Sequence, residues 1–348
     1  MTEQQRLPAE WEPQDAIMLT WPHAHSDWVS VLEDVTRLYE GLVSVIVDYA
    51  DVLITVPEEQ LEAVAARLEA MNIPMDCVHL RPAPSNDTWV RDHGPITVLS
   101  RGWVKLLDFQ FNGWGGKYAH ELDNQVTACL HASGSFPEVP LETLDWVLEG
   151  GSIEVDGRGT LMTTEACLLN PNRNPDLSRG VIEERLKALL GVSEIHWLRH
   201  GHLEGDDTDS HIDILARFCP DNIVVYTQCD DPQDAHYKDL CAMEVELRAM
   251  TNAEGQAYRL LPLPWPGPVL NGEGERLAAS YANFLVVNGA VLVPQYDCPA
   301  DEQALEQLMQ AFPGYHILGI PCSLLIEQGG SLHCITMQLP EGVLYDAA

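Results

Sequence analysis

The feature that most constrains the fold is a repeating order of predicted elements: two short strands, a helix and a further strand. Helical spacing of apolar residues recurs in five long segments, at 28–46, 61–71, 181–189, 240–250 and 305–312. Between these helices lie short β-rich runs bounded by turn residues. One pair of runs, 284–287 and 290–293, surrounds the hairpin signal Asn288-Gly289.

The repeats predict a chain that closes on itself. The first repeat covers 96–141, and the next three begin at Ile153, His211 and Phe284. A fifth begins at Leu332, and the strand 17–21 and its following helix complete it. Closure removes exposed sheet edges, as in propellers. An open doubly wound α/β sheet is the alternative. Because no linker interrupts the order, we expect one domain over residues 1–348.

Composition narrows the function classes. The chain of 348 residues carries 19 Lys plus Arg against 53 Asp plus Glu, a formal net charge of −34. Its 46% apolar residues are typical of a globular protein. Phosphate contacts need clustered cations, so this composition argues against a nucleic-acid partner. The charge repels anionic membranes and attracts cationic small molecules, although a solubility surface is the simpler explanation.

Cysteine usage and the N-terminus favour the cytoplasm. The first eight residues contain no apolar signal region, and no apolar run approaches the ~20 residues that span a bilayer. The nine cysteines are irregularly spaced, and no two form C-x-x-C. This pattern suits reduced thiols in a cytoplasmic protein and leaves room for one reactive thiol. The oligomeric state, including a homo-oligomer, stays open.

Four polar segments interrupt the globular pattern: Trp89–Pro95, Leu148–Ser152, Asp206–Asp213 and Gly329–Cys334. Asp92, Glu149, His211 and Cys334 are separated by 57, 62 and 123 residues, and the last interval is two repeats long. The polar positions therefore recur in phase, and a pseudo-symmetric propeller would bring them to one axial cleft.

Each polar residue also has a structural explanation. Asp92 and Glu149 could lie at solvated turns or strand ends, and the acidic run before His211 could be a solvated loop. On a strand, His211 and Asp213 would share one face, because side chains alternate with period two. Cys334 would be an inert core thiol if it lay in an apolar strand. The occurrence of all of them in phase favours a functional site.

Carboxylates, a histidine and a cysteine suit chemistry on a guanidinium group. Its planar fork of N–H donors can be held by two carboxylates, which leaves the central carbon open to a thiolate. A histidine can protonate the departing amine and then activate water. This set predicts a cysteine hydrolase that modifies guanidines.

The motifs resemble those of agmatine deiminases and bacterial-type peptidyl-arginine deiminases, in the guanidino-group-modifying superfamily. The resemblance covers nearly the whole chain and is carried by these segments: Leu7–Pro13, Trp89–Pro95, Trp114–Tyr118, Leu148–Ile153, Asp156–Leu161, Thr163–Pro175, Asp206–Asp213 and Gly330–Thr336. It implies a five-bladed α/β propeller, in agreement with the closed repeat.

The resemblance also implies roles for individual residues. Cys334 is expected to be the nucleophile and His211 the general acid/base, while Asp92 and Asp213 hold the guanidinium. Glu149 matches a further acidic residue that orients the guanidinium or His211. The implied reaction converts agmatine to N-carbamoylputrescine and ammonia through an S-amidino-cysteine intermediate, without a metal or organic cofactor.

Three departures from the family pattern lie beside the expected pocket. Gln14 stands where many members have His, Ser210 stands where Gly commonly precedes the His, and Ser331–Gln338 differs from the sequence common in agmatine-active members. They remove no catalytic group. They keep peptidyl-arginine or another small guanidine open as the substrate.

Two other function classes would account for part of the sequence. Asp209-Ser210-His211-Ile212-Asp213 resembles the ligand block of manganese ureohydrolases, and carboxylate-rich ligands suit manganese. A second Asp-x-Asp block is absent downstream, and this reading leaves Cys334 and Glu149 without a role. A non-enzymatic polyamine-binding protein would account for the acidic charge alone.

Substrate choice depends on the residues around the substrate tail. Asp207, in the acidic loop, is the expected contact for the distal amine of agmatine, and Trp89 and Trp114 could flank the aliphatic chain or belong to the core. The carboxylate of arginine would instead need a cation. The nearby candidates are Arg91, Lys117 and Arg217.

Overall fold

The computed structural model describes residues 5–100 and 103–345. The chain divides into two compact units. Unit 1 contains Glu12–Gly150 and the segment 334–345; unit 2 contains 5–11 and Gly151–His333. The prediction of one catalytic domain stays a prediction.

Five sheets share one topology, in which the first strand runs antiparallel to the second and the second runs parallel to the third. A helix connects each parallel pair, as a crossover requires. The predicted mixed α/β class with five strand–strand–helix–strand repeats is therefore confirmed. Three sheets lie in unit 2 and two in unit 1.

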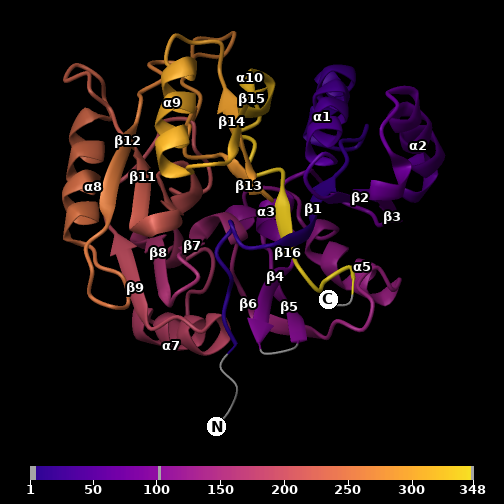
Figure 1. The fold of residues 1–348 in the computed structure, drawn as a ribbon, viewed down its shortest axis with the longest axis horizontal. Coiled ribbons are helices and arrows are strands. Elements are labelled where there is room, and N and C mark those ends of the chain that lie inside the picture. The colour runs from indigo at the N-terminus through magenta and orange to yellow at the C-terminus, as the bar shows by residue number, and fades with distance from the viewer. Residues whose placement is uncertain (1–4, 101–102, 346–348) are drawn as a thin grey trace. The chain divides into compact units, whose positions relative to one another are not determined.

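Unit 1 contains a three-stranded and a four-stranded sheet (Figure 1). The first consists of β4 (Ile96–Ser100), β5 (Trp103–Gln110) and β6 (Leu141–Val147), with α5 (Val126–Ala132) in the crossover. The second is β16 (Met337–Pro340), β1 (Gln14–Thr20), β2 (Asp51–Val56) and β3 (Val78–Pro82), with α1 (Leu32–Ile46) and α2 (Leu61–Ala70) as crossovers.

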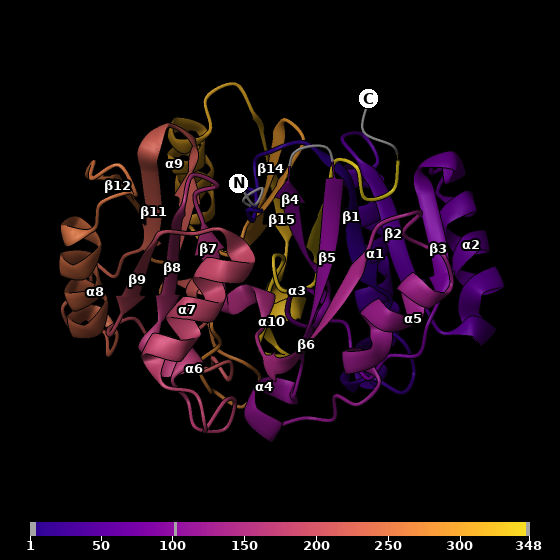
Figure 2. The same cartoon turned by 90° about the horizontal axis from the view of Figure 1, so that it is seen from below.

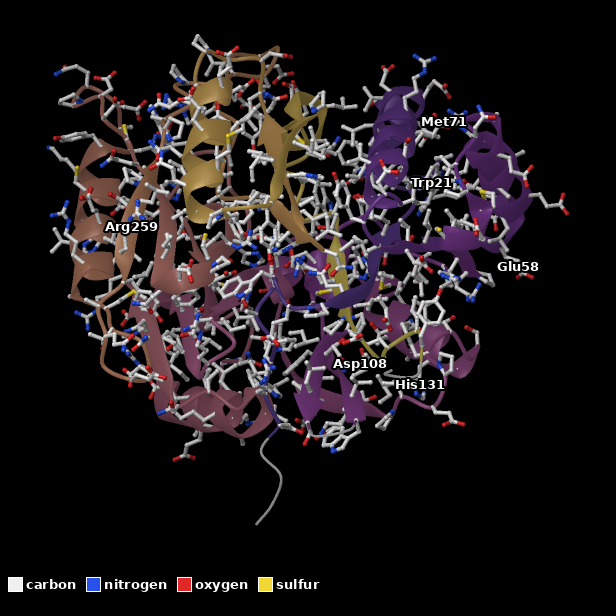
Figure 3. All side chains as sticks on the ribbon, viewed as in Figure 1. Trp21, Glu58, Met71, Asp108, His131 and Arg259 are labelled. Atoms are coloured by element: carbon white, nitrogen blue, oxygen red, sulfur yellow. The ribbon has the colours of Figure 1, made fainter. Side chains whose placement is uncertain are left out.

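The pairing of β16 with β1 joins the two ends of the chain within one sheet, with Met18 opposite Met337. This confirms the predicted fifth repeat. Its first strand begins at Met337, however, and residues 332–335 form a turn. Trp21, which follows β1 and is labelled in Figure 3, packs edge-on against Tyr39 of α1.

Unit 2 contains three sheets of three strands, and Figure 2 shows α7 beside β8 and β9. The strands are β7 (Ile153–Val155), β8 (Thr160–Thr164), β9 (Glu194–Leu198), β10 (Ala216–Cys219), β11 (Ile223–Thr227), β12 (Arg259–Leu263), β13 (Leu285–Val287), β14 (Ala290–Gln295) and β15 (His316–Pro321). The crossover helices are α7 (Arg179–Leu190), α8 (Tyr237–Ala249) and α9 (Asp301–Ala311). The predicted hairpin at Asn288-Gly289 joins β13 to β14.

Each unit has a core that reaches a predicted site segment. In unit 1, Val90 packs with residues of β1, β5, α5 and β16. In unit 2, Ile212 and Ile214 pack with residues of β8, β11 and α8. These apolar anchors stand beside Asp92 and on both sides of Asp213, so burial of the anchors fixes the backbone that carries the carboxylates.

Candidate active site

Asp92 lies on a short buried helix of unit 1, α3 (Val90–His93). Its side chain is buried, and its Oδ2 accepts a hydrogen bond of 2.9 Å from the indole Nε1–H of Trp114. A charge-assisted bond of this kind fixes the orientation of the carboxylate. The sequence left Trp114 open between flanking the substrate chain and belonging to the core; the structure gives it a contact with Asp92.

A left-handed stretch of backbone places Trp114. Gly113, Trp114, Gly115 and Gly116 have φ values of 66°, 54°, 87° and 81°. A side chain at Gly113 would bring its Cβ to 2.4 Å from the carbonyl oxygen of Tyr118, so only glycine fits. The backbone of Trp114 itself has a left-handed conformation that non-glycine residues rarely adopt, and this conformation directs its indole.

The segment of Glu149 packs on the backbone of the same helix. A Cβ at Gly150 would stand 2.1 Å from the carbonyl oxygen of Arg91, which explains the glycine. The side chain of Glu149 is fully buried. The segment is therefore placed by close approach of two backbones.

Cys334, near the C-terminal end of the chain, is hydrogen-bonded to the backbone of α3. The backbone N–H of Arg91 donates to the carbonyl oxygen of Cys334 at 3.2 Å. The guanidinium of Arg91 donates to the side chains of Met337 and Gln338 on β16. Cys334 is buried in the turn before β16, so its predicted position on a strand is wrong. The backbone of Arg91 thus contacts both the Glu149 and the Cys334 segments.

Trp89 precedes α3 and is buried against Trp28, with ring centroids 5.7 Å apart. This contact accounts for the residue as part of the core. A role toward the substrate chain stays a prediction.

In unit 2, His211 and Asp213 belong to a turn and not to a strand. His211 is the N-terminal flanking residue of a 3₁₀ helix, Ile212–Ile214, and β10 begins only at Ala216. The period-two argument for a shared face was therefore wrong, because a 3₁₀ helix has three residues per turn. Both side chains are buried, His211 at 1% and Asp213 at 0% exposure.

The acidic loop before His211 is internally bonded. Asp206 accepts hydrogen bonds from the backbone of Thr208 and Ser210. The guanidinium of Arg173, whose side chain is fully buried, pairs with Asp209 at 2.6 Å and donates to the carbonyl of Thr208. The run is thus a structured turn rather than a solvated loop.

Two consecutive residues of this loop have left-handed backbone: Asp209 with φ 66° and Ser210 with φ 64°. Glycine adopts this conformation without steric cost, which explains why a glycine would suit position 210. The carbonyl of Ser210 accepts a hydrogen bond from the Thr164 hydroxyl, which helps to hold the turn in front of His211.

Asp207 is half-buried in the same loop. A Cβ at Gly329 would lie 3.2 Å from its Oδ1, so the carboxylate sits against the glycine backbone. This identifies Gly329 as a place of close approach.

The environment of Asp213 favours its ionised form. Burial alone would raise the pKa of its carboxyl, but a hydrogen bond from His333 and the charges of His333, His211 and Arg217 lower it below the ordinary value. Nδ1 of His333 stands 2.9 Å from Oδ2 of Asp213.

Several residues of this environment escaped the sequence reasoning. His333 and Glu10 lie within motifs that carried the family resemblance, yet neither received a role. Cys167 is a further case: its Sγ lies within 4.8 Å of a ring nitrogen of His211. All three residues lie inside segments that carry the family resemblance, and this position is the feature of the sequence that could have identified them.

Two of the three cations considered for a substrate carboxylate are buried against protein groups. Arg217 is 1% exposed and pairs with Glu10 and Glu154. Arg91 is buried against Gln338. Of the three cations considered for a substrate carboxylate, Lys117 is exposed.

No helix among residues 5–100 and 103–345 combines the length and the apolar character that a membrane span needs. The nine cysteines are all free thiols.

Comparisons with known proteins place the chain in a family. The agmatine deiminase of Pseudomonas syringae pv. tomato is 37% identical, with 96% of this chain and 95% of the relative covered. The solved agmatine deiminase of C. jejuni with substrate bound is 37% identical, with a TM-score of 0.89 and 97% of each chain covered. A crystal structure assigned to a peptidyl-arginine deiminase is 42% identical, with a TM-score of 0.93 over 98% of this chain and all of that one.

The family model described as Porphyromonas-type peptidyl-arginine deiminase matches residues 6–340. This match spans both units, and it confirms the resemblance that the motifs indicated. The chain belongs to the Porphyromonas-type peptidyl-arginine deiminase family.

Proposed function

We propose that this protein is a cysteine-dependent agmatine deiminase. It hydrolyses agmatine to N-carbamoylputrescine and ammonia. The observation that carries the proposal is the match, over 95% or more of both chains, to relatives named agmatine deiminase. The buried carboxylates and thiol of the site segments supply the groups that this chemistry needs.

The reaction begins at the guanidinium carbon. Asp92 and Asp213 accept hydrogen bonds from the guanidinium N–H groups and stabilise its charge. The Cys334 thiolate attacks the carbon, and a C–S bond forms. His211 protonates the departing nitrogen, and ammonia leaves as its C–N bond breaks.

Hydrolysis completes the cycle. His211 then takes a proton from water, and the hydroxide adds to the S-amidino carbon. The C–S bond breaks, Cys334 is released as a thiolate, and the carbamoyl product departs. Glu149 keeps the predicted role of orienting the guanidinium or His211.

Agmatine is favoured over free arginine by charge. Agmatine carries a distal amine, and the half-buried Asp207 is a suitable partner for it. Arginine would bring a carboxylate, whereas Arg91 and Arg217 are buried in pairs with protein groups. We expect agmatine to exceed arginine at least ~100-fold in kcat/KM, the scale of one attractive and one repulsive charge contact.

Peptidyl-arginine is the second candidate, because the family model carries that name. Ureido-product formation should be measured in parallel with agmatine, arginine and a peptide ending in arginine. Mass spectrometry should find a gain of about 1 Da, as a nitrogen with its hydrogen is replaced by oxygen. A faster reaction with the peptide would overturn the agmatine assignment and leave the deiminase chemistry intact.

Two further outcomes would replace the proposal. Urea release that EDTA abolishes and manganese restores would indicate a ureohydrolase. Binding of agmatine without turnover would indicate a binding protein. We also propose a cytoplasmic location, supported by the nine free thiols.

A further inference from the structure

Both ring nitrogens of His333 face carboxylates. Nδ1 lies 2.9 Å from Oδ2 of Asp213, and Nε2 lies 2.8 Å from Oε1 of Glu10. The ring is 1% exposed. The backbone N–H of His333 donates to the side-chain oxygen of Asn283 at 2.9 Å, which fixes the residue from the backbone side as well.

Two carboxylates on one ring favour its charged form. An ionised carboxylate can only accept hydrogen bonds, so each ring nitrogen must act as a donor. A neutral imidazole has one N–H, whereas the imidazolium has two. The lowered pKa of Asp213 favours its ionised form, and the ion pair with Arg217 favours the ionised form of Glu10. With both carboxylates ionised, His333 bridges Asp213 and Glu10 as a cation.

Arg217 anchors the far end of the bridge. Its guanidinium pairs with Glu10 and, at 2.8 Å, with Glu154. It also donates to the carbonyl oxygens of Ala282 and Phe284, at 3.1 and 2.9 Å. Burial would lower the pKa of Arg217, but the charges of Glu10, Glu154 and Asp213 raise it above the ordinary value. The anchor is a permanent cation.

We propose that His333 is a positioning residue for the deimination reaction. Its imidazolium holds Oδ2 of Asp213, which fixes the plane in which that carboxylate meets a guanidinium. Cys334 follows His333 directly in the chain. One anchored residue therefore restrains both the carboxylate and the backbone that carries the nucleophile. The inference rests on the proposed function for its chemistry, and on contacts within unit 2 for its geometry.

Two variants test separately the contacts of His333 with Asp213 and with Glu10. In His333→Asn, the side-chain amide stands where Nδ1 stood and can still donate to Asp213. In His333→Gln, the amide reaches toward the place of Nε2 and Glu10, and the donor to Asp213 is lost. Both variants remove the positive charge, so each is the matched control of the other.

The positioning role predicts unequal losses. We expect kcat/KM with agmatine to fall ~10-fold in His333→Asn and ~100-fold or more in His333→Gln, with kcat lowered and KM raised in the latter. Thermal unfolding should show both variants folded at the assay temperature. Equal kcat/KM values in the two variants, or losses that follow the folded fraction alone, would overturn the proposal.

A spectroscopic measurement tests the bridge without turnover. In protein labelled with ¹⁵N-histidine, the ring resonances that disappear in His333→Gln should have imidazolium shifts in the wild type at pH 8. Neutral-imidazole shifts would overturn the proposal. If the wild type converted no guanidine, the proposed function would fail, while these resonances would still decide whether the charged bridge exists.

Discussion

The indole Nε1–H of Trp114 donates a hydrogen bond of 2.9 Å to Oδ2 of Asp92, between two buried side chains. The bond joins a left-handed glycine-rich stretch to α3, 22 residues earlier in the chain. Trp114, which the sequence left open between the substrate chain and the core, thus orients one of the predicted site carboxylates.

Trp114→Phe tests this relationship. Phenylalanine retains most of the packing against Phe111 and loses the donor. A hydrogen bond to a charged group is worth about 1.5–3 kcal/mol, so we expect kcat/KM with agmatine to fall about 10- to 100-fold. The same change in an Asp92→Asn background should have a much smaller effect. A variant within twofold of the wild type would contradict the orienting role.

Cys334→Ala should abolish turnover, because the covalent step has no substitute group. Cys334→Ser should be nearly as inactive, since a hydroxyl is a far weaker nucleophile than a thiolate at neutral pH. Cys322→Ala is the matched control: this thiol is also buried, and burial raises its pKa to about 12. Activity above a few per cent in Cys334→Ala, measured in a single-turnover assay, would rule out the covalent mechanism.

His93, next to Asp92, should make the fold sensitive to acid. Burial lowers the pKa of its imidazole to about 3 from 6.5, and within residues 5–100 and 103–345 neither ring nitrogen has a hydrogen-bond partner. Between pH 6.5 and 3 the unfolded chain binds this proton and the folded chain does not. Its contribution to stability therefore decreases as the pH falls, by about 1.4 kcal/mol per pH unit.

His93→Met removes this titration and keeps an apolar side chain beside Phe111. Two buried carboxylates change the stability with pH in the opposite direction, because burial raises the pKa of Asp87 to about 6 and that of Asp123 to about 7. The quantity to measure is therefore the difference in unfolding free energy between wild type and variant from pH 7 to 4. A difference that does not change with pH would refute the prediction.

Ser210→Gly should stabilise the fold. Ser210 has φ 64°, a conformation that costs a residue with a Cβ about 1–2 kcal/mol. Part of that gain is offset by the entropy of an added glycine in the unfolded chain, so we expect about 0.5–1 kcal/mol in denaturant unfolding. Ser210→Ala keeps the backbone cost and should give no gain. Equal stability of the two variants would contradict the strain argument.

The repeat was readable because local signals carry it. Hairpin turns, strand runs and helical periodicity each depend on neighbours in the chain. Five repeats of these signals in the same order predicted five sheets. The pairing of β16 with β1 followed from the same order, since an incomplete repeat at each end needs its missing strands.

The local geometry of the site residues was not readable in this way. The alternation rule assumed that His211 and Asp213 lie on a strand, but Ile212 and Ile214 are buried in a core and the chain turns there. Cys334 likewise lies in a turn, because its carbonyl oxygen accepts from the Arg91 backbone instead of joining a ladder. Both outcomes depend on residues far along the chain: Met162 lies 50 positions before Ile212, and Arg91 lies 243 positions before Cys334.

The sequence by itself determined the repeat, the family and the residue types for guanidine chemistry, because these follow from periodicity and motif order along the chain. Only the tertiary structure decided which groups orient the carboxylates. Trp114 meets Asp92, and His333 joins Asp213 to Glu10, because folding buries these groups and a buried polar group must find a partner wherever the backbone brings one. The partner is the group that lies close in three dimensions, and this proximity cannot be read from the spacing of residues along the chain.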